Sequence, residues 1–193
     1  MTIDITAITA TWQRPQLLAL CLWQFRQQEL GGLRCEHLVI SDGPDARARA
    51  TAEYHGARYL ELDRNYGLWG ATCNDAGVVA ARGEYVVFWN DDNVYYPHAL
   101  ASLFAASRGV DIGVCQTVHW SKTRHRILPL NWSGQLQLGH VDTMCVCVHR
   151  ELARQELWAV EPVPYEVDFG WLTRLQQRGA TVSFSPVVIG EHL

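Results

Sequence analysis

The residues best suited to chemistry are two adjacent carboxylates that follow an apolar stretch. "YVVFWNDDN" runs from Tyr85 to Asn93 and places Asp91 and Asp92 directly after a segment typical of a buried strand. A hard divalent cation such as Mg²⁺ or Mn²⁺ would relieve the repulsion between these charges and would commonly bridge them to a diphosphate. The same pair would alternatively cap the helix expected near Pro97, or lie on a solvated loop.

Further polar side chains follow other predicted strands. Asp42 ends the second strand, where its oxygens would either accept an imide N–H such as that of uracil or cap the Gly43-Pro44 turn. Thr11 adds a hydroxyl at the end of the first strand. The loop "RNYGLWG", which contains Asn65, leads into a helix N-terminus that favours an anion. It contains neither G-x-G-x-x-G nor a Walker motif, which argues against a dinucleotide or P-loop enzyme.

The elements that must position these residues alternate between strand and helix in the first half of the chain. Such alternation predicts a parallel sheet with helices on both faces and ligands at the carboxyl ends of the strands. We expect Gly83 to close the third helix. The predicted strands cover residues 4–12, 36–41, 57–62 and 84–89, and the predicted helices residues 15–28, 46–56, 70–82 and 97–109.

The second half is expected to be mixed and rich in loops. Its predicted strands cover residues 110–120, 125–132, 141–149 and 181–186, and its helices begin at Arg150 and at Tyr165. A chain of 193 residues is large enough for one domain with a sizeable core.

Composition excludes several classes of protein. The net charge of −4 gives no general attraction to nucleic acid or to acidic membranes. The longest apolar runs are shorter than the roughly 18 residues of a membrane span, and the first residues do not resemble a secretory signal, so we expect a cytoplasmic protein. The six cysteines form no C-x-x-C pair, which favours buried reduced thiols over disulfides or a zinc site.

Four segments together identify a family. They are "ITATWQRPQLLALCLWQF", "HLVISDGPD", "NYGLWGATCNDAGVVAARGEYVVFWNDDN" and "VDFGWLTRLQQRG". On these segments the chain resembles family 2 glycosyltransferases of the GT-A fold over nearly its whole length. The resemblance implies an α/β, Rossmann-like sandwich in one domain, 1–193, with a nucleotide-binding half (about 1–110) and an acceptor-side, catalytic-base half (about 111–193). It also implies inverting, metal-dependent transfer of a sugar from a nucleotide-diphosphate donor, with a UDP-sugar favoured, to an acceptor hydroxyl.

The resemblance also assigns roles to residues. It implies that Asp91 contacts the ribose and that Asp92 binds Mn²⁺ or Mg²⁺, and we attribute the neutralisation of the pair to this metal and to no side chain of the protein. His192 is a candidate to complete the metal or diphosphate site, since imidazole suits Mn²⁺ better than Mg²⁺. A histidine so near the C-terminus would alternatively be frayed and without function. The implied nucleotide-sugar-binding residues are Thr11, Asp42, Asn65, Asp91 and Asp92, and the implied acceptor-side residues are Asp142 and Trp171. We expect the acceptor to be bound by Trp132, Trp158 and Trp171 with nearby loops, or by a partner protein.

The catalytic base is expected to be Asp168. Inverting transfer needs one carboxylate to remove a proton from the attacking hydroxyl, and Asp168 matches the family's base. Glu166 lies two residues earlier and would face another direction. Both acids would alternatively favour the dipole of the helix that begins here.

The residues leave several alternatives. Cys73-Asn74-Asp75 stands where the family commonly has Ala-Arg-Asn, so the Arg often seen near the donor is missing. Two other functions remain: a nucleotidyltransferase acting on a sugar phosphate, and a module that binds nucleotide sugars without turnover. The acceptor and the oligomeric state, a homo-oligomer included, are not determined by the sequence.

Overall fold

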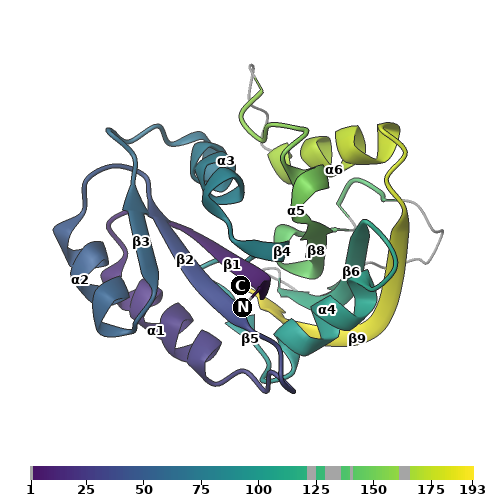
Figure 1. Cartoon of the computed structure of the whole chain (residues 1–193), viewed down its shortest axis with the longest axis horizontal. Coiled ribbons are helices and arrows are strands. Elements are labelled where there is room, and N and C mark those ends of the chain that lie inside the picture. Colours follow the sequence, from purple (N-terminus) through teal and green to yellow (C-terminus); the bar gives the residue numbers. More distant parts are fainter. Residues whose placement is uncertain (1, 121–124, 129–135, 140, 161–165) are drawn as a thin grey trace.

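The computed structural model describes residues 2–120, 125–128, 136–139, 141–160 and 166–193. Within them, nine strands form one sheet in the order β3-β2-β1-β4-β8-β6-β9-β5, with β7 paired to β6 (Figure 1). The strands are β1 Ile3–Thr11, β2 Cys35–Ser41, β3 Arg58–Glu61, β4 Gly83–Phe88, β5 Val94–Tyr95, β6 Ile112–Trp120, β7 His125–Leu128, β8 Val146–His149 and β9 Val182–His192.

Strands β3, β2, β1 and β4 are parallel and form the predicted first half of the sheet. Helices α1 (Pro15–Arg26) and α2 (Ala46–Tyr54) cover one face, where Leu18 and Leu22 pack with Val39. Helix α3 (Ala71–Ala80) covers the other face, so closely that a Cβ on Gly77 would lie 2.4 Å from Cγ2 of Ile8. The expectation of helices on both faces is therefore confirmed.

The second half is mixed, as predicted. Strand β8 runs antiparallel between β4 and β6, whereas β9 runs parallel to β6. Helix α4 (Ala99–Ser107) lies on the side of α1 and α2, whereas α5 (Arg150–Ala153) and α6 (Val167–Gln177) lie on the side of α3 (Figure 1). Side chains of β4 alternate accordingly, with Tyr85 against Phe104 of α4 and Phe88 against Trp171 of α6.

Three predicted boundaries are wrong. Gly83 does not close α3 but begins β4, where a Cβ would lie 2.4 Å from the amide nitrogen of Thr6. The segment 141–149 is a strand only from Val146, because a 3₁₀ turn, η2 (Thr143–Cys145), precedes it. Strand β9 extends to His192, well beyond the predicted end at residue 186.

The cysteines are free thiols, and five of the six are buried. Burial raises the pKa of Cys35, Cys73, Cys115 and Cys147 to about 12, so these thiols are protonated at neutral pH. In the part of the chain that the structure describes, no helix is both long and apolar enough to cross a membrane.

Candidate active site

The carboxyl ends of β1, β2 and β4 meet at one edge of the sheet. Strand β1 lies between its two parallel neighbours, with Thr11 in register with Ser41 and Ile8 with Phe88. Because parallel strands end at the same edge, Thr11, Asp42 and the Asp91-Asp92 pair lie there together, as their strand ends predicted.

Asp91 is a buried carboxylate that the fold orients. It is 2% exposed, and its Oδ2 accepts a hydrogen bond from the Thr11 hydroxyl at 2.7 Å. Nη2 of Arg14 lies 2.8 Å from its Oδ1, close enough for an ion pair but not aligned as a hydrogen bond. Burial raises the pKa of Asp91 to about 6, although Thr11 and Arg14 act in the opposite direction.

Asp92 differs from its neighbour because its side chain is 52% exposed. Its Oδ2 accepts a hydrogen bond from Nη1 of Arg14 at 3.1 Å. The arginine thus contacts both carboxylates, and the expectation that no side chain of the protein neutralises the pair is wrong. Sequence reasoning missed Arg14, although its place just after β1 puts it at the same sheet edge as Thr11.

Asp42 organises the loop that follows β3. Its carboxylate accepts hydrogen bonds from Nδ2 of Asn65 at 2.9 Å and from the backbone N–H groups of Tyr66 and Gly67 at 2.9 and 2.8 Å. A carboxylate has about four acceptor positions, so one remains for a ligand. Asn65 thus serves to hold this loop in place through Asp42.

The same loop carries an exposed tryptophan in an unusual conformation. Leu68 and Trp69 have φ angles of 48° and 55°, in the left-handed region that costs about 1–2 kcal/mol for each non-glycine residue. Trp69 is 69% exposed, and the next residue, Gly70, lies close to Ala10 of β1. Sequence reasoning treated it only as part of the loop, because no pattern predicts two consecutive left-handed residues here.

Asp168 and Glu166 have different environments, as expected. Asp168 lies in the first turn of α6 and is partly buried, and its Oδ1 accepts a hydrogen bond from its neighbouring backbone N–H at 2.7 Å. Burial is the main cause that raises the pKa of Asp168 to about 6, with a smaller contribution from Asp142. Glu166 is exposed at the N-cap of the helix.

Asp142 and His192 form a pair whose charges act on Asp168. Nδ1 of His192 is 3.2 Å from Oδ2 of Asp142, although not in hydrogen-bond alignment, and its ring stacks on His119 at 4.6 Å. The other oxygen of Asp142 caps η2 by accepting from the backbone N–H of Met144 at 2.9 Å.

A hydrogen bond joins the two groups of acids. Nδ2 of Asn90, the residue before Asp91, donates to the hydroxyl of Thr143, the residue after Asp142, at 3.0 Å. The Asp91-Asp92 pair and the group formed by Asp142, Asp168 and His192 are therefore neighbouring parts of one site.

Comparison with known proteins identifies the family. The model of a family described as "Glycosyl transferase family 2" matches residues 6–149, about three quarters of the chain. The chain belongs to glycosyl transferase family 2. No curated protein sequence matches it significantly.

Solved structures show that this family 2 glycosyltransferase has the GT-A fold. TarS 1-349 from S. aureus has a TM-score of 0.79 at 13% identity, over 98% of this chain and 60% of that one. A mannosyltransferase from Pyrobaculum calidifontis, solved with GDP-Man and Mn²⁺, has a TM-score of 0.70 at 16% identity, over 100% of this chain and 57% of that one. The chain thus spans about 60% of the length of these structures. TarS 1-349 has also been solved with UDP and with UDP-GlcNAc.

The side chains of this glycosyltransferase that could bind a metal suit a cation that takes most of its ligands from a bound diphosphate. The described residues contain no group of three His, Cys, Asp or Glu side chains that could enclose a metal. Asp92 offers an exposed carboxylate, and Mg²⁺ in nucleotide enzymes is commonly held by one or two carboxylates plus phosphate oxygens and water. None of the described contacts joins His192 to Asp92.

Two of the tryptophans expected near the acceptor, Trp158 and Trp171, are buried. Trp171 is 0% exposed, and it stacks on Trp158 at 4.4 Å and donates to the carbonyl of Glu156. It is a core residue in this structure, and Trp132 lies outside the described residues. Asp75, part of the departure from the family pattern, accepts the backbone N–H of Trp158 at 2.7 Å and so supports this core.

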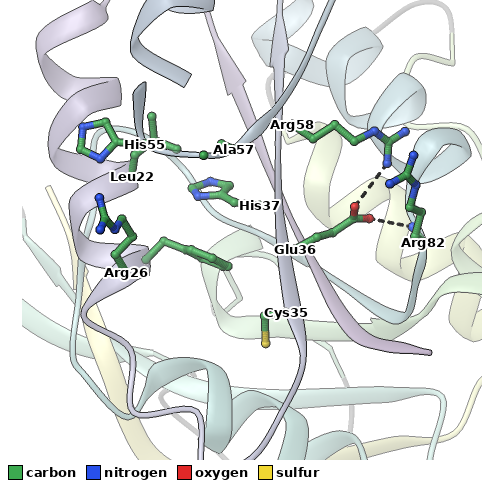
Figure 2. A pocket seen from close by; sticks show the side chains of 11 residues that line it. Leu22, Arg26, Cys35, Glu36, His37, His55, Ala57, Arg58 and Arg82 are labelled. Atoms are coloured by element: carbon green, nitrogen blue, oxygen red, sulfur yellow. Dashed lines mark hydrogen bonds and ion pairs between the residues drawn. The ribbon is translucent and has the colours of Figure 1, made fainter. Parts of the chain in front are cut away.

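A cavity of about 260 Å³ lies away from the site, at the opposite edge of the sheet, where β2 and β3 begin (Figure 2). Glu36 in its wall is already satisfied: it accepts from the Thr6 hydroxyl at 2.7 Å and from the backbone N–H of Arg82 at 2.8 Å, and it pairs with Arg58 at 3.3 Å. Burial lowers the pKa of His37 to about 3, so its ring is neutral. We interpret this cavity as structural.

Proposed function

We propose that this chain transfers a sugar, with inversion, from a nucleoside-diphosphate donor to an acceptor hydroxyl with the help of Mn²⁺ or Mg²⁺. One observation carries the proposal: an oriented, buried Asp91 and an exposed Asp92 lie at the carboxyl edge of the parallel strands, and the chain supplies a separate carboxylate, Asp168, whose pKa is raised.

The donor would bind across the ends of β1, β2 and β4. The remaining acceptor position of Asp42 suits an imide N–H of the base, and Asp91, already oriented by Thr11, suits a ribose hydroxyl. Asp92 would hold the cation, which when bound stabilises negative charge on the departing diphosphate. Solved structures similar to this chain contain UDP, UDP-GlcNAc or GDP-Man. We favour a uracil nucleotide, because Asp42 is expected to accept the imide N–H of that base.

The acceptor half supplies the base. In this proposal the oxygen of the acceptor hydroxyl attacks the anomeric carbon and the bond to the diphosphate breaks, while a carboxylate oxygen of Asp168 takes the proton of that hydroxyl. A single displacement inverts the configuration at the anomeric carbon and needs only one protein carboxylate as base. The charges of Asp142 and His192 act on Asp168, and these two residues would help to define the acceptor-side wall.

Donor binding can be tested by thermal unfolding. UDP with Mn²⁺ at about 100 times its Kd would stabilise the protein by about 2.7 kcal/mol, which corresponds to a rise in Tm of roughly 5–10 °C. UDP-sugars should then be turned over, with release of UDP. If UDP, GDP and TDP all left Tm unchanged with either cation, the proposed function would be wrong. Binding without turnover would favour a binding module, and pyrophosphate release from a nucleoside triphosphate would favour a nucleotidyltransferase.

The rate of transfer is expected to fall in acid. Both Asp168 and Asp91 have a pKa raised from the usual 3.8 to about 6, so both carboxylates become protonated below that pH. A protonated Asp168 cannot accept a proton, so kcat/KM should be level above about pH 7 and fall about tenfold per pH unit below pH 6, or more steeply if both groups must be ionised. A pH profile measured at saturating Mn²⁺ checks this. A profile that stays level down to pH 4.5 would contradict it.

A further inference from the structure

Arg14 contacts Asp92, the proposed ligand of the divalent cation. Its guanidinium lies 2.8 Å from Asp91 and 3.1 Å from Oδ2 of Asp92, and its backbone is fixed at the N-cap of α1, just before Pro15. A divalent cation binds a carboxylate oxygen at about 2.0–2.2 Å. A cation on either oxygen of Asp92 would therefore lie close to the guanidinium, and their like charges would repel each other.

The two ion pairs of Arg14 are unequal. The side chain of Asp91 is 1% exposed and is also held by Thr11, whereas that of Asp92 is 52% exposed. Exposed ion pairs contribute only about 0–1 kcal/mol, so the contact with Asp92 is the easier one to break. The Arg14 side chain is itself 43% exposed, so it has room to turn toward a ligand.

A diphosphate provides the charge that would draw Arg14 away. Guanidinium groups bind phosphate oxygens through paired N–H donors, and the donor diphosphate in the proposed function lies at this edge. We propose that Arg14 is an internal counter-ion that occupies Asp92 in the free protein and yields it to the divalent cation when a nucleoside diphosphate binds. The proposal rests on the proposed function, and it makes cation binding depend on the nucleotide.

The test compares Mn²⁺ binding to the full chain without nucleotide, measured from the electron paramagnetic resonance signal of free Mn²⁺. Arg14→Met is expected to bind Mn²⁺ about tenfold more tightly than the wild type, since an adjacent positive charge is removed. Its affinity for UDP in the presence of Mn²⁺ is expected to fall, because a phosphate-binding group is lost. The double variant Arg14→Met/Asp92→Asn should lose the gain in Mn²⁺ affinity, which locates the effect at Asp92.

Arg47→Met is the matched control, because this arginine is exposed at the start of α2 and its replacement changes the net charge equally. It should leave Mn²⁺ affinity close to that of the wild type. Arg14→Lys provides a second variant if Arg14→Met does not fold: its single ammonium cannot hold both carboxylates as the guanidinium does, so it should bind Mn²⁺ with intermediate affinity.

Unchanged or weaker Mn²⁺ binding in the folded Arg14 variants would overturn the proposal, as would an equal gain in Arg47→Met. Failure of the proposed function has a different signature. In that case UDP does not increase the Mn²⁺ affinity of the wild type, whatever the Arg14 variants show.

Discussion

Replacing Asp168 with asparagine is expected to reduce sugar transfer by about 10²–10⁴-fold, the range typical of losing a general base. Asparagine keeps the shape of the side chain and can still accept the hydrogen bond of the Phe169 N–H, but it cannot accept a proton from the acceptor. The rate is measured as UDP release with donor and acceptor at saturation. Full activity in this variant would exclude Asp168 as the base.

The same substitution is expected to leave the fold intact or to stabilise it. Since burial raises the pKa of Asp168 to about 6, the folded protein binds this proton more tightly than the unfolded chain does. The ionised carboxylate therefore destabilises the fold above about pH 6. This cost disappears as the pH falls toward the pKa that the same carboxyl group has in the unfolded chain. Asparagine removes a cost on the order of 1–2 kcal/mol at pH 8, after a discount for partial exposure.

Glu166→Gln is the matched control for Asp168. Glu166 is exposed at the N-cap of α6, two residues before the proposed base, and its removal changes the net charge by the same amount. It should retain nearly wild-type activity and stability. A larger loss of activity in Glu166→Gln than in Asp168→Asn would reverse the assignment of the base.

Replacing Asp92 with alanine is expected to abolish the metal-dependent part of nucleotide binding while the fold stays intact. The side chain is half exposed, and its contact with Arg14 at 3.1 Å is an exposed ion pair of about 0–1 kcal/mol. Calorimetric titration with UDP should show that Mn²⁺ strengthens binding to the wild type and has no effect on the variant. Circular dichroism and the unfolding midpoint report on the fold.

Asp91→Asn separates the roles of the two carboxylates. Asp91 is buried and bonded to Thr11, so we expect its replacement to weaken UDP binding even when EDTA removes the metal. If Mn²⁺ strengthened UDP binding to Asp92→Ala as much as it does to the wild type, Asp92 would not be the metal ligand.

Much of the first half of the fold was predictable, because its signals are local. Apolar strands and helical periodicity between residues 4 and 109 predicted its α-helices and its strands except the short β5, and strand–helix alternation implies parallel neighbours. Since all such strands end at one edge, the proximity of Thr11, Asp42 and Asp91 followed without knowledge of any side-chain contact.

The second half was less predictable, because its strands pair with distant segments. Nothing local indicates that β8 enters between β4 and β6, or that β9 continues to His192 beside His119. The pair formed by Asp142 and His192 joins residues 50 positions apart and exists only because of that pairing. In the same way, the tryptophans at 158 and 171 were expected near the acceptor, whereas the structure stacks them in the core.

Residue types and short-range periodicity were enough to predict the family, the parallel half of the sheet and the edge at which Asp91 and Asp92 lie. The contacts between the charges follow only from the folded chain: Arg14 turns back from the start of α1 to both aspartates, one buried and one exposed. The direction and burial of a side chain depend on segments far away in the chain, which no local pattern encodes.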